Sequence, residues 1–171
     1  MKKIFLFTAL LCAFSSWGQI DNMNFEFGDF TGWTLDVGRR IDPTTEDYTD
    51  NEGLNINDHI RLMSPFVPPL DEHALLCDHE DIPTVFPGGV FSARIGNLEG
   101  GRVASKISRS FVVQPGFDFL QYSYAIILEE PGHTVEQQPK FLVRIKDKDG
   151  ELLSCGEFEA SSGSNAIDQG F

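Results

Sequence analysis

The chain of 171 residues is strongly acidic, with 26 Asp and Glu residues against 13 Lys and Arg residues and a formal net charge of −13. This balance argues against nucleic-acid binding, whose affinity depends on Lys and Arg side chains neutralising phosphates, and against binding to anionic membrane surfaces. It is compatible with Ca²⁺, which takes oxygen ligands, and equally with an acidic surface that only keeps the protein soluble.

Residues 1–18 have the order of a secretion signal. Two lysines precede an apolar run that ends at Phe14, and mostly small residues follow up to Gly18. The run is shorter than the about 20 residues that span a bilayer. We therefore expect a signal peptide over residues 1–18 and a secreted or cell-surface protein that begins near Gln19, with no membrane insertion of the mature chain.

Three cysteines bear on this expectation. Cys12 leaves with the signal peptide, unless it is the anchor of a lipoprotein or the apolar run is a buried N-terminal helix. Cys77 and Cys155 remain in a chain that is expected outside the cytoplasm, where disulfides persist. A Cys77–Cys155 disulfide is one interpretation, and two buried thiols are the other, because the sequence does not show the distance between their Cα atoms.

Turn residues punctuate the first half of the chain, and no long helical pattern lies between them. The expected short strands are residues 25–27, 33–37, 59–63, 74–77 and 90–95. Between the second and the third of these, residues 38–58 are polar and acidic, which predicts a long loop.

The second half shows clearer alternation. Residues 103–113 and 141–145 alternate apolar and polar side chains, as half-buried strands do. Residues 119–128 are apolar on both faces, which predicts a central strand. Asp149-Gly150 is a hairpin signal, after which residues 152–155 return antiparallel. Many short strands at regular spacing predict an all-β fold, an antiparallel sandwich or barrel.

The segment from Asn24 to Trp33 reads Asn-Phe-Glu-Phe-Gly-Asp-Phe-Thr-Gly-Trp. It resembles the opening of secreted jelly-roll domains of the carbohydrate-binding-module type. The resemblance implies a jelly-roll-like β-sandwich with Trp33 in its core rather than on a sugar-binding surface. In related modules a carboxylate at the place of Glu26 often ligates a structural Ca²⁺, so Glu26 is the expected calcium ligand and calcium the expected cofactor.

Other segments resemble a domain of the large surface proteins of gliding bacteria. These segments are residues 92–97, 124–133, 138–141 and 155–156. In that group the domain continues into further strands, beside immunoglobulin-like repeats and a sorting domain, and these features do not follow residue 156 here. The resemblance therefore implies either an N-terminal piece of a larger protein or a short natural variant.

The segment 129–133 is the most catalytic-looking cluster, with two carboxylates and a histidine. Adjacent strand residues point to opposite faces, so Glu129 and Glu130 are not expected to form the facing carboxylate pair of a glycosidase. We interpret the segment first as a turn in which His133 and Gln138 hydrogen-bond. A ligand contact through Glu130 or His133 is the second interpretation, and acid–base catalysis is the third.

Two acidic stretches suggest metals only weakly. Residues 73–81 hold His, Cys, Asp and Glu side chains, but no second cluster completes a zinc site. Residues 50–58 lack the ordered pattern of an EF-hand calcium loop. We interpret both stretches as polar loops. The chain also has no G-x-S-x-G nucleophile elbow and no phosphate-binding glycine loop followed by a helix.

Together these patterns predict a non-catalytic binding or adhesion module of an exported cell-surface protein. It would contact an extracellular glycan through stacked aromatic side chains, or another surface protein. The domain would occupy residues 19–160, with a flexible tail or truncated continuation over residues 161–171. The alternatives are the accessory front part of a secreted hydrolase and a structural spacer in a surface fibre.

Overall fold

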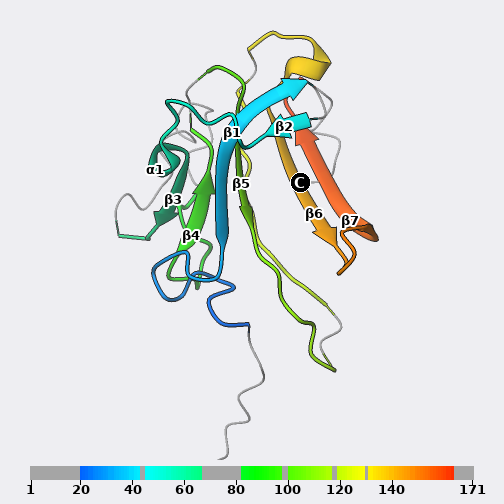
Figure 1. The fold of residues 1–171 in the computed structure, drawn as a ribbon. Helices are drawn as coiled ribbons and strands as arrows, with labels where there is room; N and C mark the ends of the chain where they lie inside the picture. Colours follow the sequence, from blue (N-terminus) through cyan, green and yellow to red (C-terminus); the bar gives the residue numbers. More distant parts are fainter. Residues whose placement is uncertain are drawn as a thin grey trace, which may run out of the picture.

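The computed structural model describes residues 20–42, 45–66, 82–97, 100–116, 119–129 and 131–163. Within them the chain forms antiparallel strands and two short helical segments, α1 (Ile56–His59) and the 3-10 turn η2 (Val135–Gln137) (Figure 1). The all-β class is therefore confirmed. The expected signal peptide, the strand expected at residues 74–77 and the tail from residue 164 lie outside the described residues.

The largest sheet has three strands in the order β2-β1-β5. They are β1 (Thr34–Asp42), β2 (Thr45–Asp47) and β5 (Val103–Ser108). Antiparallel pairing sets Leu35 opposite Ile107 and Asp36 opposite Lys106. Directly opposed residues point to the same face, so the sheet has one apolar and one charged face here.

A glycine allows β1 and β2 to approach closely. A Cβ atom added to Gly38 would lie 2.2 Å from the carbonyl oxygen of Asp47 on β2. Any larger residue would force the two strands apart, because heavy atoms do not approach so closely.

The second sheet pairs β3 (Ile60–Met63) with β4 (Ser92–Ile95). Both strands lie where the sequence places them, within two residues. Ile60 is almost completely buried, at 2% exposure, and stands opposite Ile95.

The third sheet is the hairpin of β6 (Lys140–Lys146) and β7 (Leu152–Ser161). Asp147 Oδ1 accepts hydrogen bonds from the main-chain N–H groups of Asp149 and Glu151, at 2.9 and 3.0 Å. Gly150 takes a left-handed φ of +86°, which glycine adopts at no steric cost. The hairpin predicted from Asp149-Gly150 is confirmed, and its return strand is longer than expected.

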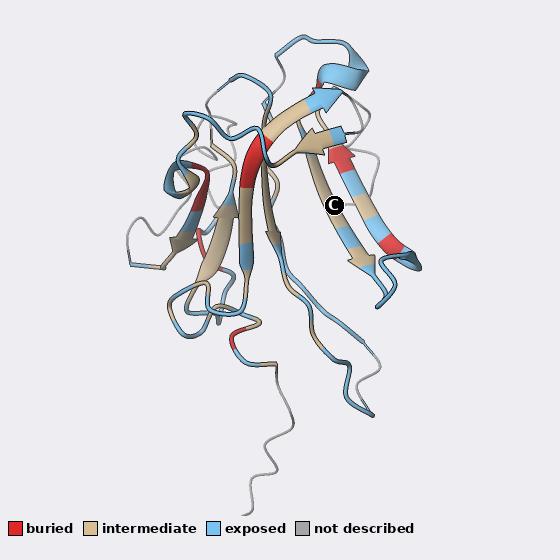
Figure 2. Ribbon diagram, viewed as in Figure 1, coloured by how far each residue is buried: buried red, intermediate tan, exposed pale blue. Residues whose placement is uncertain are grey.

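The buried apolar residues do not form one cluster. Val37, Ile60, Val85 and Ala160 are the buried hydrophobic residues in the described part of the chain. Figure 2 shows the buried residues as separate bands on different strands. Much of the apolar surface of these sheets is therefore only half covered by the residues described.

Three expectations about single segments are wrong. Residues 25–27 form turns rather than a strand, because Asn22 and Phe25 take left-handed φ values of +56° and +63°. The polar stretch 38–58 is not one loop, since it contains the end of β1, β2 and α1. Residues 119–128 belong to none of the three sheets.

Candidate functional site

The motif from Asn24 to Trp33 folds as a compact loop around Asn22. The Asn22 side chain is 4% exposed, and its Nδ2 donates to the carbonyl oxygens of Asp29 and Thr31 at 3.1 and 3.0 Å. Asn22 Oδ1 accepts from the Phe27 N–H at 2.9 Å. The Asn22 side chain thus satisfies main-chain groups of the loop that a neighbouring strand would otherwise bind.

Three contacts hold Trp33 within this loop. Phe25 stacks on it with ring centroids 4.9 Å apart, and the Arg109 guanidinium lies 5.7 Å from its centroid. Its Nε1 donates to the main-chain oxygen of Asn22 at 3.0 Å. These contacts fit the expected structural role, because they engage both the ring and its polar group.

Glu26, the expected calcium ligand, is exposed on the same loop. Within the described ranges, no group of three or more His, Cys, Asp and Glu side chains comes together where it could hold a metal ion. Calcium binding through Glu26 therefore stays a prediction.

The expected disulfide cannot be placed. Cys155 lies exposed on β7. Cys77 lies outside the described residues, so the pairing stays a prediction.

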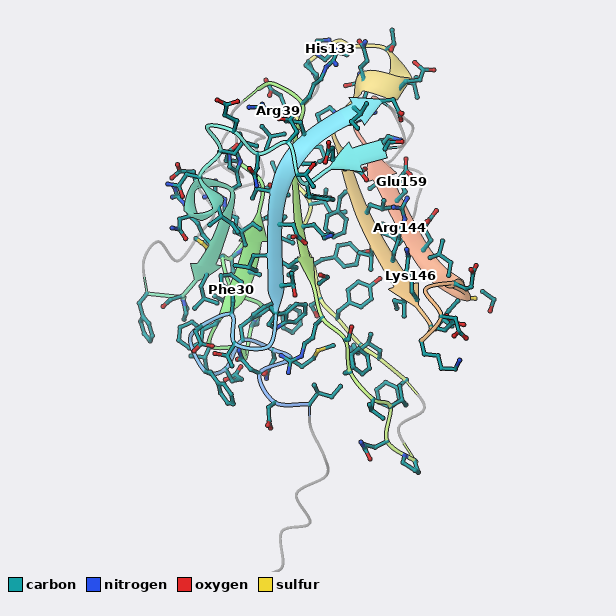
Figure 3. The ribbon with its side chains drawn as sticks, in the orientation of Figure 1. Phe30, Arg39, His133, Arg144, Lys146 and Glu159 are labelled. Atoms are coloured by element: carbon teal, nitrogen blue, oxygen red, sulfur yellow. The ribbon has the colours of Figure 1, made fainter. Side chains whose placement is uncertain are left out.

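His133, one of the two residues of the expected ligand contact, begins a turn that is held by a hydrogen bond. Glu130 lies outside the described residues, and His133 is exposed at the opposite end of the molecule from Phe30 (Figure 3). Gln138, 4% exposed, donates from Nε2 to the His133 carbonyl at 3.0 Å. The expected His133–Gln138 hydrogen bond is present, with the main-chain oxygen of His133 as acceptor.

Arg40 on β1 also donates hydrogen bonds to this turn. Its Nη1 donates to the Gln138 carbonyl at 3.1 Å, and its Nη2 donates to the Glu136 carbonyl. The sequence did not point to Arg40, because the partners are almost a hundred residues apart in the chain. These hydrogen bonds stabilise the conformation of the turn and connect it to β1.

A charged cluster surrounds Tyr48, just after β2. Lys106 Nζ lies 2.9 Å from Asp36 Oδ2 and 4.3 Å from the centre of the Tyr48 ring. Burial raises the pKa of Tyr48, and the charges of Glu46 and Asp36 raise it further, while Arg144 lowers it. Arg144 in turn lies 3.0 Å from Glu157 Oε2 on the neighbouring strand.

The Tyr48 cluster is best explained as a link between strands. Both cations, Lys106 and Arg144, are already within 3.0 Å of a carboxylate. The same face of the hairpin carries a further pair, Lys140 and Glu159, at 2.9 Å. Figure 3 shows Arg144 and Glu159 on the same hairpin. Paired charges of this kind fix strand positions and leave no evident reactive group.

The most unusual surface is formed by residues 109–116 and 119–125, which we name the aromatic arm. The chain leaves β5 at Ser108, continues below it and returns towards β6 (Figure 1). Neither limb of the arm belongs to a sheet in the described structure. The main chain of the arm therefore runs outside the sheets.

Apolar side chains gather on the arm. Of the 15 large hydrophobic residues that the described part of the chain exposes, six lie on it: Val112, Val113, Phe119, Leu120, Tyr122 and Tyr124. Phe119 is 84% exposed and Val112 76%. No charged residue occurs from Ser110 to Gly116 or from Phe119 to Leu128. Such a patch on an acidic protein is typical of a contact surface.

The base of the arm is anchored by stacked rings. Tyr124 lies 5.6 Å from Phe141 and 5.3 Å from Phe158, measured between ring centroids. Tyr122 lies 5.7 Å from Tyr124 with the rings tilted by 32°. The hairpin thus fixes Tyr124, and Tyr124 positions the more exposed Tyr122.

The sequence predicted a central strand over residues 119–128 from apolar side chains on both faces. The exposure of Tyr122 and Tyr124, 44% and 39%, shows that this segment is not fully buried. The signal that could have identified the arm is the run of ten uncharged residues in a chain of net charge −13.

Comparison with known proteins gives no identification: no family model, no curated protein and no solved structure matches the chain. Among the described residues, no helix has the length and apolarity needed to cross a membrane.

Proposed function

We propose that this chain is a non-catalytic binding or adhesion module of an exported cell-surface protein, and that the aromatic arm is its contact surface. The observation that carries the proposal is the concentration of exposed, uncharged aromatic and aliphatic side chains on residues 109–116 and 119–125. Monomeric soluble proteins rarely leave a patch of this kind uncovered.

The ligand class proposed is an extracellular glycan. Aromatic rings with one apolar face and a polar tip bind the apolar faces of sugar rings well, and Tyr122 and Tyr124 offer two adjoining rings of this type. Gln121, which precedes Tyr122, and Ser123, which separates the two tyrosines in the chain, are also exposed, and their side chains are able to form hydrogen bonds.

The fold proposed around this surface is a jelly-roll-like β-sandwich. Its support is the antiparallel pairing of all three sheets together with the resemblance of residues 24–33 to such domains. Export through residues 1–18 and a structural Ca²⁺ at Glu26 belong to the same proposal, and both rest on the sequence.

A glycan array tests the proposal. The exported protein should bind at least one extracellular glycan, and Tyr122→Ser should weaken that binding by roughly two- to tenfold, since aromatic stacking contributes about 0.5–1.5 kcal/mol. Phe86→Ser is the matched control, because Phe86 is 63% exposed but lies outside the arm. Its binding should equal that of the wild type.

The alternatives give different results in the same set of assays. Hydrolase activity would appear as cleavage of a chromogenic glycoside that is lost with Glu129→Gln. A spacer domain would neither bind nor cleave. Binding that is unchanged by Tyr122→Ser would remove the arm from the proposal.

A further inference from the structure

We propose that the aromatic arm selects uncharged glycans and discriminates against polysaccharides that carry uronate or sulfate groups. This inference rests on the proposed function of the arm and names the chemical class of its ligand. The distribution of charge carries it. Recognition of an anionic sugar requires Lys or Arg side chains, and the described part of the arm holds one cation, Arg109, which already contacts the protein itself.

The chain around the arm is depleted of cations. No Lys or Arg residue occurs between Arg109 and Lys140. With histidine counted as neutral, the charged side chains of this interval are all carboxylates: Asp118, Glu129, Glu130 and Glu136. The whole protein carries a net charge of −13. An anionic sugar on the arm would therefore meet like charges, and such juxtaposition weakens binding.

Arg109 at the base of the arm is engaged by the loop around Asn22. Its Nη1 donates to the main-chain oxygens of Asn22 and Thr31, at 3.2 and 3.3 Å, and its Nη2 donates to the main-chain oxygen of Asp21. The guanidinium also lies 5.7 Å from the centre of the Trp33 ring. An anion that reached Arg109 would have to compete with these oxygens for its N–H groups.

The hairpin that anchors the arm adds no cation on the face where the two meet. Tyr124 packs on Phe141 of β6 and Phe158 of β7. Successive residues of a strand point to opposite faces, so the cations of β6 lie on the face away from Phe141. These cations are Lys140, Arg144 and Lys146. Two of them are also ion-paired with carboxylates of β7.

The groups that the arm does expose fit a neutral sugar. Gln121 and Ser123 are exposed on either side of Tyr122 in the chain. Amide and hydroxyl side chains both donate and accept hydrogen bonds, as sugar hydroxyls do, and they carry no charge. Tyr122 and Tyr124 add two adjoining rings that can pack on the apolar faces of sugars. Binding of this kind does not depend on charge, so salt should affect it little.

An array of matched oligosaccharides tests the inference. It carries neutral oligosaccharides beside uronate and sulfated forms of the same backbones, for example mannohexaose beside oligomannuronate. We expect the exported protein to bind a neutral member and to bind its anionic form about tenfold more weakly at low salt, because several like charges repel one another. The dissociation constant of the neutral ligand should stay within about twofold between roughly 20 and 500 mM NaCl, whereas that of the anionic form should fall as salt screens the repulsion.

A charge substitution makes the test specific to the arm. Gln121→Arg places a cation beside Tyr122 and should tighten binding of the anionic form by about threefold at low salt. Ser154→Arg, at an exposed position on β7 outside the arm, makes the same change in net charge and is the matched control. It should keep the selectivity of the wild type.

Each outcome decides between the inference and the function on which it rests. A wild-type protein that binds an anionic form as tightly as the neutral one, or more tightly, overturns the inference. If Tyr122→Ser abolishes that binding, the arm is still a glycan contact and the proposed function stands. Equal gains from Gln121→Arg and Ser154→Arg would show that the net charge of the protein sets the selectivity, and would also overturn the inference. A protein that binds no member of the array removes both proposals.

Discussion

The loop around Asn22 gives the sharpest stability prediction. Asn22→Ala removes the side chain that donates to Asp29 and Thr31 and accepts from Phe27, at distances between 2.9 and 3.2 Å. Each such hydrogen bond contributes about 0.5–1.5 kcal/mol, so their loss costs roughly 3 kcal/mol. The left-handed φ of +56° adds about 1 kcal/mol, because alanine tolerates it less well than asparagine.

The expected loss of about 4 kcal/mol is a large part of the 5–15 kcal/mol that stabilises a typical domain. For a chain of this size it corresponds to a fall in Tm of roughly 10 °C. Urea denaturation followed by circular dichroism measures the free energy of unfolding directly. Asn22→Gly should lose about 1 kcal/mol less than Asn22→Ala, since glycine tolerates the left-handed backbone.

Asn24→Ala is the control for this experiment. Asn24 is exposed two residues away, so its replacement should change the free energy of unfolding by less than about 0.5 kcal/mol. If Asn22→Ala lowers the stability by less than about 1 kcal/mol, the hydrogen bonds of this side chain do not hold the loop, and the reasoning is refuted.

Three further predictions concern single groups. Burial raises the pKa of Tyr48 above its ordinary value of 10.0, so the folded state holds this proton more tightly than the unfolded state. The stability that this proton contributes is fully present below pH 10.0 and is lost as pH rises through the pKa of the folded state. The difference in absorbance between the wild type and Tyr48→Phe, followed as a function of pH, should show that Tyr48 ionises above 10.0. Ionisation of Tyr48 at or below 10.0 contradicts the assignment. Gly38→Ala should cost about 3 kcal/mol in urea denaturation, because its Cβ would meet the Asp47 carbonyl, and a loss below about 1 kcal/mol would show that β2 moves freely. The hydrogen bond from Thr49 lowers the pKa of Asp47, so Thr49→Val should raise that pKa in a carboxyl NMR titration, and an unchanged value would mean that the bond does not form in solution.

The sequence predicted those parts of the fold that depend on residues close together in the chain. Asp149-Gly150 specifies a tight turn through backbone conformation alone, so the β6–β7 hairpin could be predicted without knowing the rest of the fold. The alternation of residues 141–145 similarly fixes which face of β6 is apolar. In both cases the cause lies within a few residues of the chain.

Burial could not be predicted in the same way. Residues 119–128 have the composition of a central strand, but burial requires a covering element. The hairpin packs on Tyr124, whereas Phe119 stays 84% exposed and Tyr122 44%. The strand prediction for residues 25–27 was wrong for a different reason. Alternation of Phe with polar residues predicts a strand, whereas the Asn22 side chain stabilises left-handed turns that this pattern does not reveal.

The candidate site was also only partly accessible from sequence. Tyr122 and Tyr124 lie in a segment that the sequence marked as apolar, but their exposure depends on the path of the chain after β5. The Tyr48 cluster joins residues from three distant parts of the chain, Asp36, Lys106 and Arg144. Only strand pairing brings these charges together, and pairing partners cannot be inferred from one sequence.

Footprinting of the aromatic arm tests the central claim most directly. Hydroxyl-radical labelling of the exported protein, with and without a glycan selected on the array, reports the solvent exposure of each aromatic side chain. The account predicts that the glycan protects Phe119 and Tyr122, while Phe86, which is 63% exposed elsewhere, is labelled equally in both samples. Protection of other side chains with the arm still fully labelled would contradict the assignment of the arm as the contact surface.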